Sequence, residues 1–417
     1  MTADTCHQPG LLSVDQARAQ LQLSIAPLSE TESLPLELAC GRVLAAPARS
    51  RLDLPTCDNS AMDGYALCGE APYVVVGKSL AGHPYRASLN SGECVRITTG
   101  AALPDGADRV VMQEQAQLQA GQLLLNKATK AGDHVRYRGE DVRAGDMLLE
   151  CGRRLGVPDI ALLAAAGVGA VTVVRRVRAA LLSVGDELRP LDTAPEALGI
   201  GDIYDSNRIA LKATLQQLGL EIIDLGCLPD QPAAIRDALA QARDRADIII
   251  SSGGVSVGEA DFTRAVLEEL GQLELWRLAI KPGKPFAFGR LPKQNGETLF
   301  FGLPGNPVSA LVTLYQLVLP ALEKLQGVSA EKCQPPFTSR ARLLNPIRKS
   351  PGRTDFQRGY TYRDDDGIQV VKSTGIQGSH ILSGFAEANC FIVLPQHSGN
   401  CETGDWVTVE PFRKPLI

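Results

Sequence analysis

The middle of the chain alternates apolar runs with amphipathic stretches of roughly ten residues or more, and this alternation restricts the fold more than any other feature. Buried strands are predicted at Ala179–Val184, Glu221–Leu225, Asp247–Ile250 and Leu299–Phe301, and helices at Asn207–Leu218, Pro232–Arg243, Phe262–Leu270 and Val308–Leu325. Parallel strands need crossovers of this length, whereas a two-residue turn can join only antiparallel neighbours. Residues 179–327 are therefore predicted to form an α/β domain with a mostly parallel sheet.

Both flanks of this region consist of short β-rich runs separated by turns. Residues 72–149 predict a compact β-rich domain that follows a long loop over 51–70, and the part after Gly327 predicts a small β-barrel or sandwich. Ser13 begins a capping box, which predicts a short N-terminal helix that Pro27 ends. A chain of 417 residues is expected to form about three domains, or four if some are small.

Charge and residue usage exclude several classes of protein. The net charge is −5 and no block of Lys or Arg is present, which argues against binding to nucleic acid. The N-terminus does not look like a signal peptide, and polar residues and a proline interrupt the apolar stretch 308–322, so we expect a cytoplasmic protein without a membrane span. The ten cysteines include no C-x-x-C pair, so buried, reduced thiols are expected instead of a zinc site, an iron–sulfur cluster or disulfides.

Ligands of parallel α/β sheets bind beyond the carboxyl ends of the strands, and the loops expected there have unusual sequences. Gly253 and Gly254 follow Ser252 at one strand end, where small residues let backbone N–H groups approach a phosphate. The loop is neither a dinucleotide-binding G-x-G-x-x-G nor a P-loop. A tight turn without a ligand is the alternative interpretation.

Charged residues gather in the same loops. Six acidic residues fall at or just after predicted strand ends: Asp186, Glu187, Asp205, Asp230, Glu259 and Asp261. Carboxylates at one edge suit Mg²⁺ held jointly with a phosphate, although Asp205 and Asp261 could instead cap helices. Lys281 and Lys284 lie in a loop stiffened by prolines and could hold an anion, with a solvated turn as the alternative.

Taken together, the strings DNSAMDGYA, RITTGA, RGEDV, SVGDEL, SSGGVSVGEAD, AIKPGKPFAFG, GLPGNPVSA and GRTDFQRG closely resemble the MoeA family, from about Leu12 to Phe412. These are the molybdopterin molybdenumtransferases of molybdenum cofactor synthesis, related to the E domain of gephyrin. The resemblance implies a multidomain α/β plus β protein with four domains. They are a discontinuous domain I (1–51 and 144–178), an inserted β-rich domain II (52–143), a MogA-like molybdopterin-binding α/β domain III (179–327) and a C-terminal β-barrel domain IV (328–417).

The resemblance also implies a reaction and its participants. Adenylylated molybdopterin and molybdate would yield the molybdenum cofactor and AMP, with Mg²⁺ or another divalent cation. The protein would be a homodimer whose active cleft lies between subunits. It would make transient contact with a MogA-type adenylyltransferase and with acceptor molybdoenzymes, and with neither nucleic acid nor membrane.

Residue roles follow from the same resemblance, position by position. Glu187 and Asp261 are implied as metal ligands, with Asp230 supporting the site. The implied catalytic residues are Asp63, Thr99, Asp141, Glu187, Asp230, Asp261 and Lys281. The implied substrate-binding residues are Arg136, Asp205, Ser206, Ser252, Gly253, Gly254, Arg277, Lys284, Pro304, Gly305 and Pro307. Two positions depart from the family pattern, Val184 where threonine is common and Arg277 where lysine is frequent.

Three alternatives remain open on the sequence. A MogA-type molybdopterin adenylyltransferase and a CinA-type nucleotide pyrophosphatase share the α/β domain, and SSGGVS alone fits either of them. The DNSAMDGYA and RGED strings favour the molybdenumtransferase, because the stand-alone domains lack them. A gephyrin-like scaffold is the non-enzymatic alternative, disfavoured because no long interaction linker is present.

Overall fold

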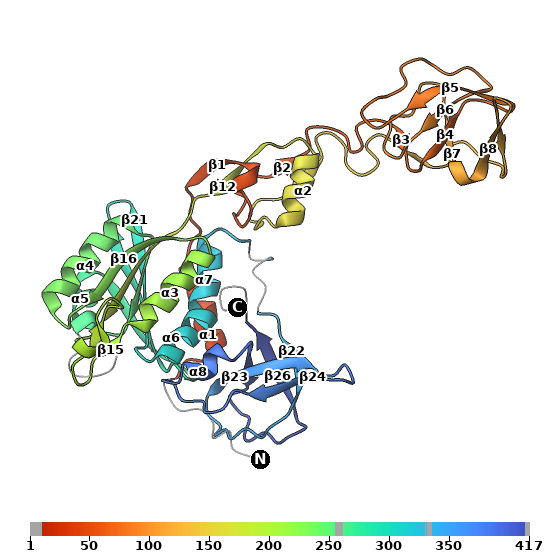
Figure 1. Ribbon diagram of the computed structural model, residues 1–417. Coiled ribbons are helices and arrows are strands. Elements are labelled where there is room, and N and C mark those ends of the chain that lie inside the picture. The colour runs from red at the N-terminus through yellow and green to blue at the C-terminus, as the bar shows by residue number, and fades with distance from the viewer. Residues whose placement is uncertain (1–10, 255–261, 330, 332–335, 413–417) are drawn as a thin grey trace, which may run out of the picture. The chain divides into compact units, whose positions relative to one another are not determined.

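The computed structural model describes residues 11–254, 262–329, 331 and 336–412 and forms two compact units. The main unit contains residues 1–30 and 174–417, and the inserted unit contains residues 31–173 (Figure 1). Each unit is described by itself.

The main unit is built on a six-stranded sheet in the order β16-β13-β17-β21-β20-β18. Its strands are β13 (Arg178–Val184), β16 (Glu221–Leu228), β17 (Ile248–Ser252), β18 (Gln272–Arg277), β20 (Pro285–Lys293) and β21 (Gly296–Leu303). The four predicted strands are parallel to one another. Sequence reasoning missed β20, which pairs antiparallel with β21, and β18, which pairs antiparallel with β20. The prediction of a mostly parallel α/β sheet is confirmed.

Helices cover both faces of this sheet (Figure 1). They are α3 (Ser206–Gln217), α4 (Pro232–Arg245), α5 (Phe262–Leu270), α6 (Pro307–Thr313) and α7 (Leu319–Leu325), with a π-helical turn at Leu314–Val318 between the last two. Alternate residues of each strand point to opposite faces. On β17, Ile250 packs in the cluster with α3, α6 and α7, whereas Ile249 packs in the cluster with α4 and α5. The carboxyl ends of the parallel strands are left uncovered for a site.

The N-terminal helix α1 (Val14–Ser24) starts at the predicted capping box and packs against α7. Pro320 of α7 has no N–H, and the carbonyl of Gln316, four residues earlier, accepts instead from Arg18 Nε of α1 at 2.7 Å. Within the described residues, Pro307–Leu325 is the one helical stretch long and apolar enough to cross a membrane. Eighteen consecutive residues of it have a mean hydropathy of 1.3, and 78% of them are buried in the protein. That burial is typical of a core helix.

The C-terminal part of the main unit is a closed five-stranded barrel, as predicted. Its strands are β22 (Ser339–Leu343), β23 (Thr354–Arg363), β24 (Gln369–Ser373), β25 (Cys390–Leu394) and β26 (Trp406–Pro411), with the short helix α8 (Ser383–Ala386). The pairing of β23 with β25 closes the barrel. Strand β23 was not predicted, and it also pairs with β19 (Ile280–Lys281) of the preceding α/β region.

The inserted unit contains a six-stranded sheet in the order β7-β4-β6-β5-β9-β8. Its strands are β4 (Gly64–Leu67), β5 (Tyr73–Ser79), β6 (Glu93–Ile97), β7 (Arg109–Met112), β8 (Ala116–Gln119) and β9 (Gln122–Leu125). The expectation of a loop over 51–70 is wrong at β4, which pairs with both β6 and β7. Its short sequence shows no clear alternation, so the pairing depends on its neighbours.

Shorter elements complete both units. In the inserted unit they are β1 (Thr31–Pro35), η1 (Leu36–Leu38), β2 (Ala48–Arg49), β3 (Asn59–Ser60), η2 (Gln113–Gln115), β10 (Val135–Arg136), β11 (Met147–Leu149), α2 (Val157–Ala165) and β12 (Ala170–Val174). In the main unit they are β14 (Leu188–Arg189), η3 (Pro195–Ala197) and β15 (Ile203–Tyr204).

The described cysteines are all free thiols. Burial raises the pKa of Cys94 and of Cys390 to about 12, so both thiols stay protonated at neutral pH. Cys40, Cys57 and Cys151 are exposed, contrary to the expectation that the thiols would be buried.

Candidate active site

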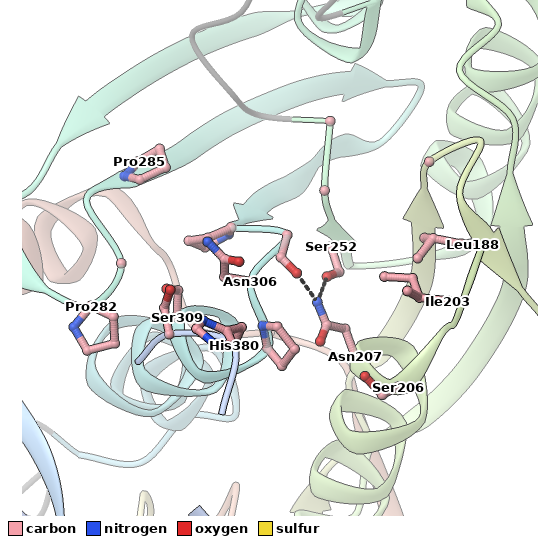
Figure 2. Close-up of a pocket in the computed structure, with 18 of the residues that line it drawn as sticks. Leu188, Ile203, Ser206, Asn207, Ser252, Pro282, Pro285, Asn306, Ser309 and His380 are labelled. Carbon is pink, nitrogen blue, oxygen red and sulfur yellow. Dashed lines mark hydrogen bonds between the residues drawn. The ribbon is translucent and has the colours of Figure 1, made fainter. Parts of the chain in front are cut away.

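A cleft of about 1120 Å³ opens in the main unit beside the carboxyl ends of β13, β17 and β21. The first residues of α3 and α6 also line it, as Figure 2 shows. The predicted site residues that line the cleft are Glu187, Asp205, Ser206, Asp230, Ser252, Gly253, Gly254, Lys281, Lys284, Pro304, Gly305 and Pro307. The structure thus brings together loops that are more than a hundred residues apart in the sequence.

Asn207, in the first turn of α3, links three of these loops. Its side-chain amide donates to Ser252 Oγ at 2.8 Å and to the Gly305 carbonyl at 2.7 Å (Figure 2). The ends of β17, α3 and the β21–α6 turn are therefore held together by one side chain. Sequence reasoning placed Asn207 only at a helix start, because nothing local indicates its partners.

The two glycines after β17 allow the backbone to pass close to β13. Gly253 has a φ of +83° and Gly254 a φ of +70°, values that residues with a Cβ rarely adopt. A Cβ on Gly253 would lie 2.6 Å from the Val184 carbonyl oxygen, and one on Gly254 would lie 2.3 Å from Thr263 Oγ1. The close approach to the β13 backbone therefore requires glycine at position 253, and a side chain at position 254 would collide with Thr263 of α5.

Carboxylates line the cleft beside β13 and β16. Glu187 is exposed, and its carboxylate lies next to Gly185, where an added Cβ would come within 2.6 Å of Oε2. No described residue makes a hydrogen bond or ion pair with that carboxylate. Asp230 N donates to Asp186 Oδ1 at 3.1 Å, and Asp186 N lies 3.4 Å from Asp230 Oδ2, which ties these two loops together. Glu187 therefore has oxygen atoms available to a ligand.

Asp205 is engaged differently from Glu187, because it is buried as the N-cap of α3. Its oxygens accept from Ser183 Oγ at 2.9 Å, from Arg208 N at 3.2 Å and from Arg208 Nε at 2.8 Å. The capping role considered from the sequence is present. Asp205 thus positions the start of α3 at the cleft wall.

Of the two predicted metal ligands, Glu187 lines the cleft, whereas Asp261 lies outside the described residues, as does Glu259. Within the described ranges, no three His, Cys, Asp or Glu side chains are close enough together to hold a metal ion.

Cations also line the cleft. Lys281, Lys284 and Arg353 line it, and a smaller cavity of about 260 Å³ lies between Lys284 and the Pro351–Arg353 turn. Lys281 Nζ lies 3.5 Å from Asp355 Oδ2 of β23. Arg277, predicted to bind substrate, is exposed at the end of β18 and does not line the cleft.

The barrel contributes a second wall that sequence reasoning missed. Gln377, Ser379 and His380 line the cleft from the loop after β24. The buried Arg358 holds this loop, because its Nη2 donates to the carbonyls of Ile376 at 2.9 Å and Gly378 at 3.2 Å. Burial lowers the pKa of Arg358. The GRTDFQRG string was a usable signal for this wall, but its strand was not recognised.

The other predicted site residues belong to the inserted unit. Asp63 Oδ1 accepts from Thr99 N at 2.7 Å and from Thr99 Oγ1 at 2.8 Å, and these bonds lower the pKa of the exposed Asp63 carboxyl. Arg136 is exposed at the end of β10, and Asp141 N donates to the Leu54 carbonyl at 3.0 Å. The structure joins Asp63 and Thr99 directly.

Family models match three successive regions of the chain. They are the "MoeA N-terminal region (domain I and II)" over residues 12–167, the "Probable molybdopterin binding domain" over 180–324, and the "MoeA C-terminal region (domain IV)" over 340–412.

Individual relatives match over nearly the whole length. The molybdopterin molybdenumtransferase of Haemophilus influenzae is 46% identical over 412 residues, which cover 97% of this chain and 100% of that protein. A protein of the same name from Nostoc sp. is 37% identical, covering 88% of this chain and 85% of that protein. The solved structure of a molybdopterin biosynthesis MoeA protein from Pyrococcus horikoshii OT3 is 27% identical and has a TM-score of 0.82. It covers 96% of this chain and 100% of that chain.

Proposed function

The chain belongs to the MoeA family and is an enzyme of molybdenum cofactor biosynthesis, and we propose that it inserts molybdenum from molybdate into adenylylated molybdopterin with release of AMP. The observation that carries this proposal is the cleft itself. Glu187, with free carboxylate oxygens, and the cations Lys281, Lys284 and Arg353 line the same cleft. Such a combination of charges suits a substrate that carries phosphates and a second substrate that is an oxyanion.

The phosphates of the adenylylated substrate fit the β17 side of the cleft. Gly253 and Gly254 keep that backbone free of side chains, and Asn207 fixes Ser252 and Gly305 around it. Lys281 and Lys284 would hold molybdate within reach of the dithiolene sulfurs, which replace oxygens on molybdenum as AMP leaves. The protein's share of the reaction is then binding and orientation, without a protein nucleophile.

A divalent cation, in the first instance Mg²⁺, fits the donor set at Glu187. Mg²⁺ prefers oxygen ligands and usually combines one or two protein carboxylates with substrate phosphates and water. Glu187 and Asp261 would hold it, and Asp230 would support the site through its bonds to Asp186. When bound, the cation supplies positive charge against the phosphoanhydride.

Hydrophobic clusters support in part the division into domains I to IV, although one cluster of the α/β core also takes in Phe356, Phe391 and Phe412 of the barrel. One cluster joins Leu44 to Leu155 and Val173 within the inserted unit, and its β-rich sheet has clusters of its own. The barrel has another around Val371. The first residues of the chain differ from that scheme, because α1 packs with the α/β core.

Family membership supports the remaining parts of the proposal. We place the enzyme in the cytoplasm as a homodimer, with Asp63, Thr99, Arg136 and Asp141 supplied to each cleft by the inserted unit of the partner subunit. Transient contacts with a MogA-type adenylyltransferase and with acceptor molybdoenzymes would deliver the substrate and receive the product.

The test is to incubate the purified protein with adenylylated molybdopterin, molybdate and Mg²⁺, and to measure AMP and molybdenum cofactor. Both should form together, and EDTA should prevent both. Formation of adenylylated molybdopterin from ATP, with the adenylylated pterin left intact in the presence of molybdate, would instead identify an adenylyltransferase.

The metal role is tested with Glu187→Gln. The Mg²⁺ concentration at half-maximal activity should rise by about tenfold or more, because one charged ligand is lost. Glu196→Gln is the matched control, since Glu196 is exposed in the same segment and does not line the cleft. An unchanged Mg²⁺ dependence of the Glu187 variant contradicts the assignment.

A further inference from the structure

Asp355 is a buried acid in the barrel wall next to the cleft. It is 1% exposed, and its Oδ2 accepts no hydrogen bond from any described residue. A buried carboxylate is costly unless it is paired with a positive charge. The one ion pair found for it among the described residues is with Lys281 Nζ, at 3.5 Å.

The backbone holds these two residues opposite each other. Strands β19 and β23 are parallel, with Lys281 in register with Asp355, and Thr354 N donates to the Ala279 carbonyl at 2.8 Å. The turn after Lys281 is equally constrained, because Gly283 has a φ of +109° and an added Cβ there would meet Thr313 Cγ2 at 2.7 Å. With the backbone fixed, only the side chain of Lys281 can change its contacts.

The Lys281 ammonium lies within reach of both Asp355 and a ligand bound in the cleft. Its side chain is 48% exposed and lines the cleft beside Lys284 and Arg353. Its distance of 3.5 Å from Asp355 is longer than a charge-assisted hydrogen bond. An oxyanion in the cleft therefore competes with Asp355 for the same ammonium.

Neighbouring cations make Asp355 the balancing charge of this region. Burial lowers the pKa of Lys349. The positive charges of Lys281 and Arg353 lower this pKa further, whereas the negative charge of Asp355 raises it. Lys349 Nζ is itself occupied by the Ser398 carbonyl at 2.9 Å. Lys281 is thus the cation that links Asp355 to the cleft.

We propose that Asp355 is a positioning residue that holds the Lys281 ammonium at the edge of the cleft and competes with the bound oxyanion for it. The carboxylate keeps the lysine in place before the substrate arrives and limits how tightly an oxyanion is retained. This inference rests on the proposed function, since it assigns the regulation of oxyanion binding at the same cleft.

The test is Asp355→Asn in the full-length protein, with molybdate and inorganic phosphate as probes in calorimetric titrations. Loss of the competing carboxylate should tighten molybdate binding by about fivefold to tenfold, because a nearby negative charge is removed. The KM for molybdate should fall, and kcat should fall with it because Lys281 is no longer held in place. A merely structural role predicts weaker binding, so an unchanged or higher Kd overturns the proposal.

Measuring the effect of Asp355→Asn in a protein that also carries Lys281→Met shows whether Asp355 acts through Lys281. With Lys281→Met present, Asp355→Asn should change the molybdate Kd by less than about twofold. If the full tightening persists there, Asp355 acts on the anion directly and the positioning role is refuted. Asp365→Asn is the matched control, because it removes an exposed carboxylate from a turn of the same barrel.

If Asp355→Asn does not fold, Asp355→Glu provides the test instead. It keeps the carboxylate and should bind molybdate within about twofold of wild type, and tightening to the level expected for Asn overturns the proposal. Wild-type protein that makes no cofactor, yet shows the expected changes in molybdate binding, refutes the proposed function alone. Normal cofactor synthesis with no change in molybdate binding refutes the role of Asp355 alone.

Discussion

Replacing Gly253 by alanine tests whether the backbone contact at the end of β17 shapes the cleft. A residue with a Cβ at a φ of +83° is strained by roughly 1–2 kcal/mol. The Cβ would also lie 2.6 Å from the Val184 carbonyl oxygen, a separation that real Cβ atoms essentially never show. Relieving such overpacking costs about 1–3 kcal/mol, so a total loss of about 2–5 kcal/mol is expected.

Gly226→Ala separates the two contributions. Gly226 lies in β16 of the same sheet with a φ of +77°, and no atom lies within 4 Å of the position of an added Cβ. It should therefore show the backbone strain without the clash. The difference in the free energy of unfolding between the two variants should be about 1–3 kcal/mol.

Urea unfolding followed by tryptophan fluorescence measures this difference. The chain has two tryptophans, and Trp276 lies in β18 of the α/β sheet whereas Trp406 lies in the barrel. A Trp406→Phe background therefore makes the signal specific to the sheet. Cofactor formation should fall strongly only in the Gly253 variant. Equal stability losses for the two variants, within about 0.5 kcal/mol, would refute the claim that the contact with Val184 requires glycine.

Three further predictions concern other contacts. Asn207→Ala removes two hydrogen bonds at the cleft and should raise the KM for adenylylated molybdopterin by about tenfold; an unchanged KM in initial-rate assays would show that this link is dispensable. Arg175→Met leaves the buried Asp247 without its main partner and should cost about 3–5 kcal/mol at pH 7. Burial raises the pKa of Asp247, but its hydrogen bonds, chiefly from Arg175, hold it below its usual value. In wild type, the stability that the lowered pKa of Asp247 contributes is lost as the pH falls. In the variant, protonation removes the unpaired negative charge, so the difference in the free energy of unfolding between wild type and variant, measured by urea unfolding, should be smaller near pH ~4. Thr99→Val keeps the backbone bond to Asp63 but loses the hydroxyl bond, so carbon NMR titration should show the pKa of Asp63 rising towards its usual value; no rise would exclude a contribution from the hydroxyl.

Local pattern was sufficient where an element carries its own signal. The helix predicted to end at Leu270 does so, and its apolar residues are periodic, whereas the strand Cys390–Leu394 has the predicted bounds because it is a continuous apolar run. The rule that ligands bind at the carboxyl ends of parallel strands indicated most of the cleft-lining loops. Family resemblance then named residues, such as Glu187 and Lys281, that physical reasoning alone left open.

Tertiary pairing decided what the sequence could not show. Strand β4 lies inside its sheet because β6 and β7 flank it, although its own sequence resembles a loop. Arg353 lines the cleft because β23 pairs with β19, some seventy positions earlier in the chain. Asn207 looked like an ordinary residue of a first helical turn, and its two partners come from loops far along the chain.

The two points at which the chain leaves and re-enters the main unit are neighbours. Arg175 N donates to the Glu30 carbonyl at 3.0 Å, and the Arg175 side chain binds both Glu30 and Asp247. If codons 31–173 were removed from the gene, a short linker would therefore be enough to join residue 30 to residue 174. Such an excision would keep the cleft of the main unit and remove the inserted unit, which carries the predicted residues Asp63, Thr99, Arg136 and Asp141.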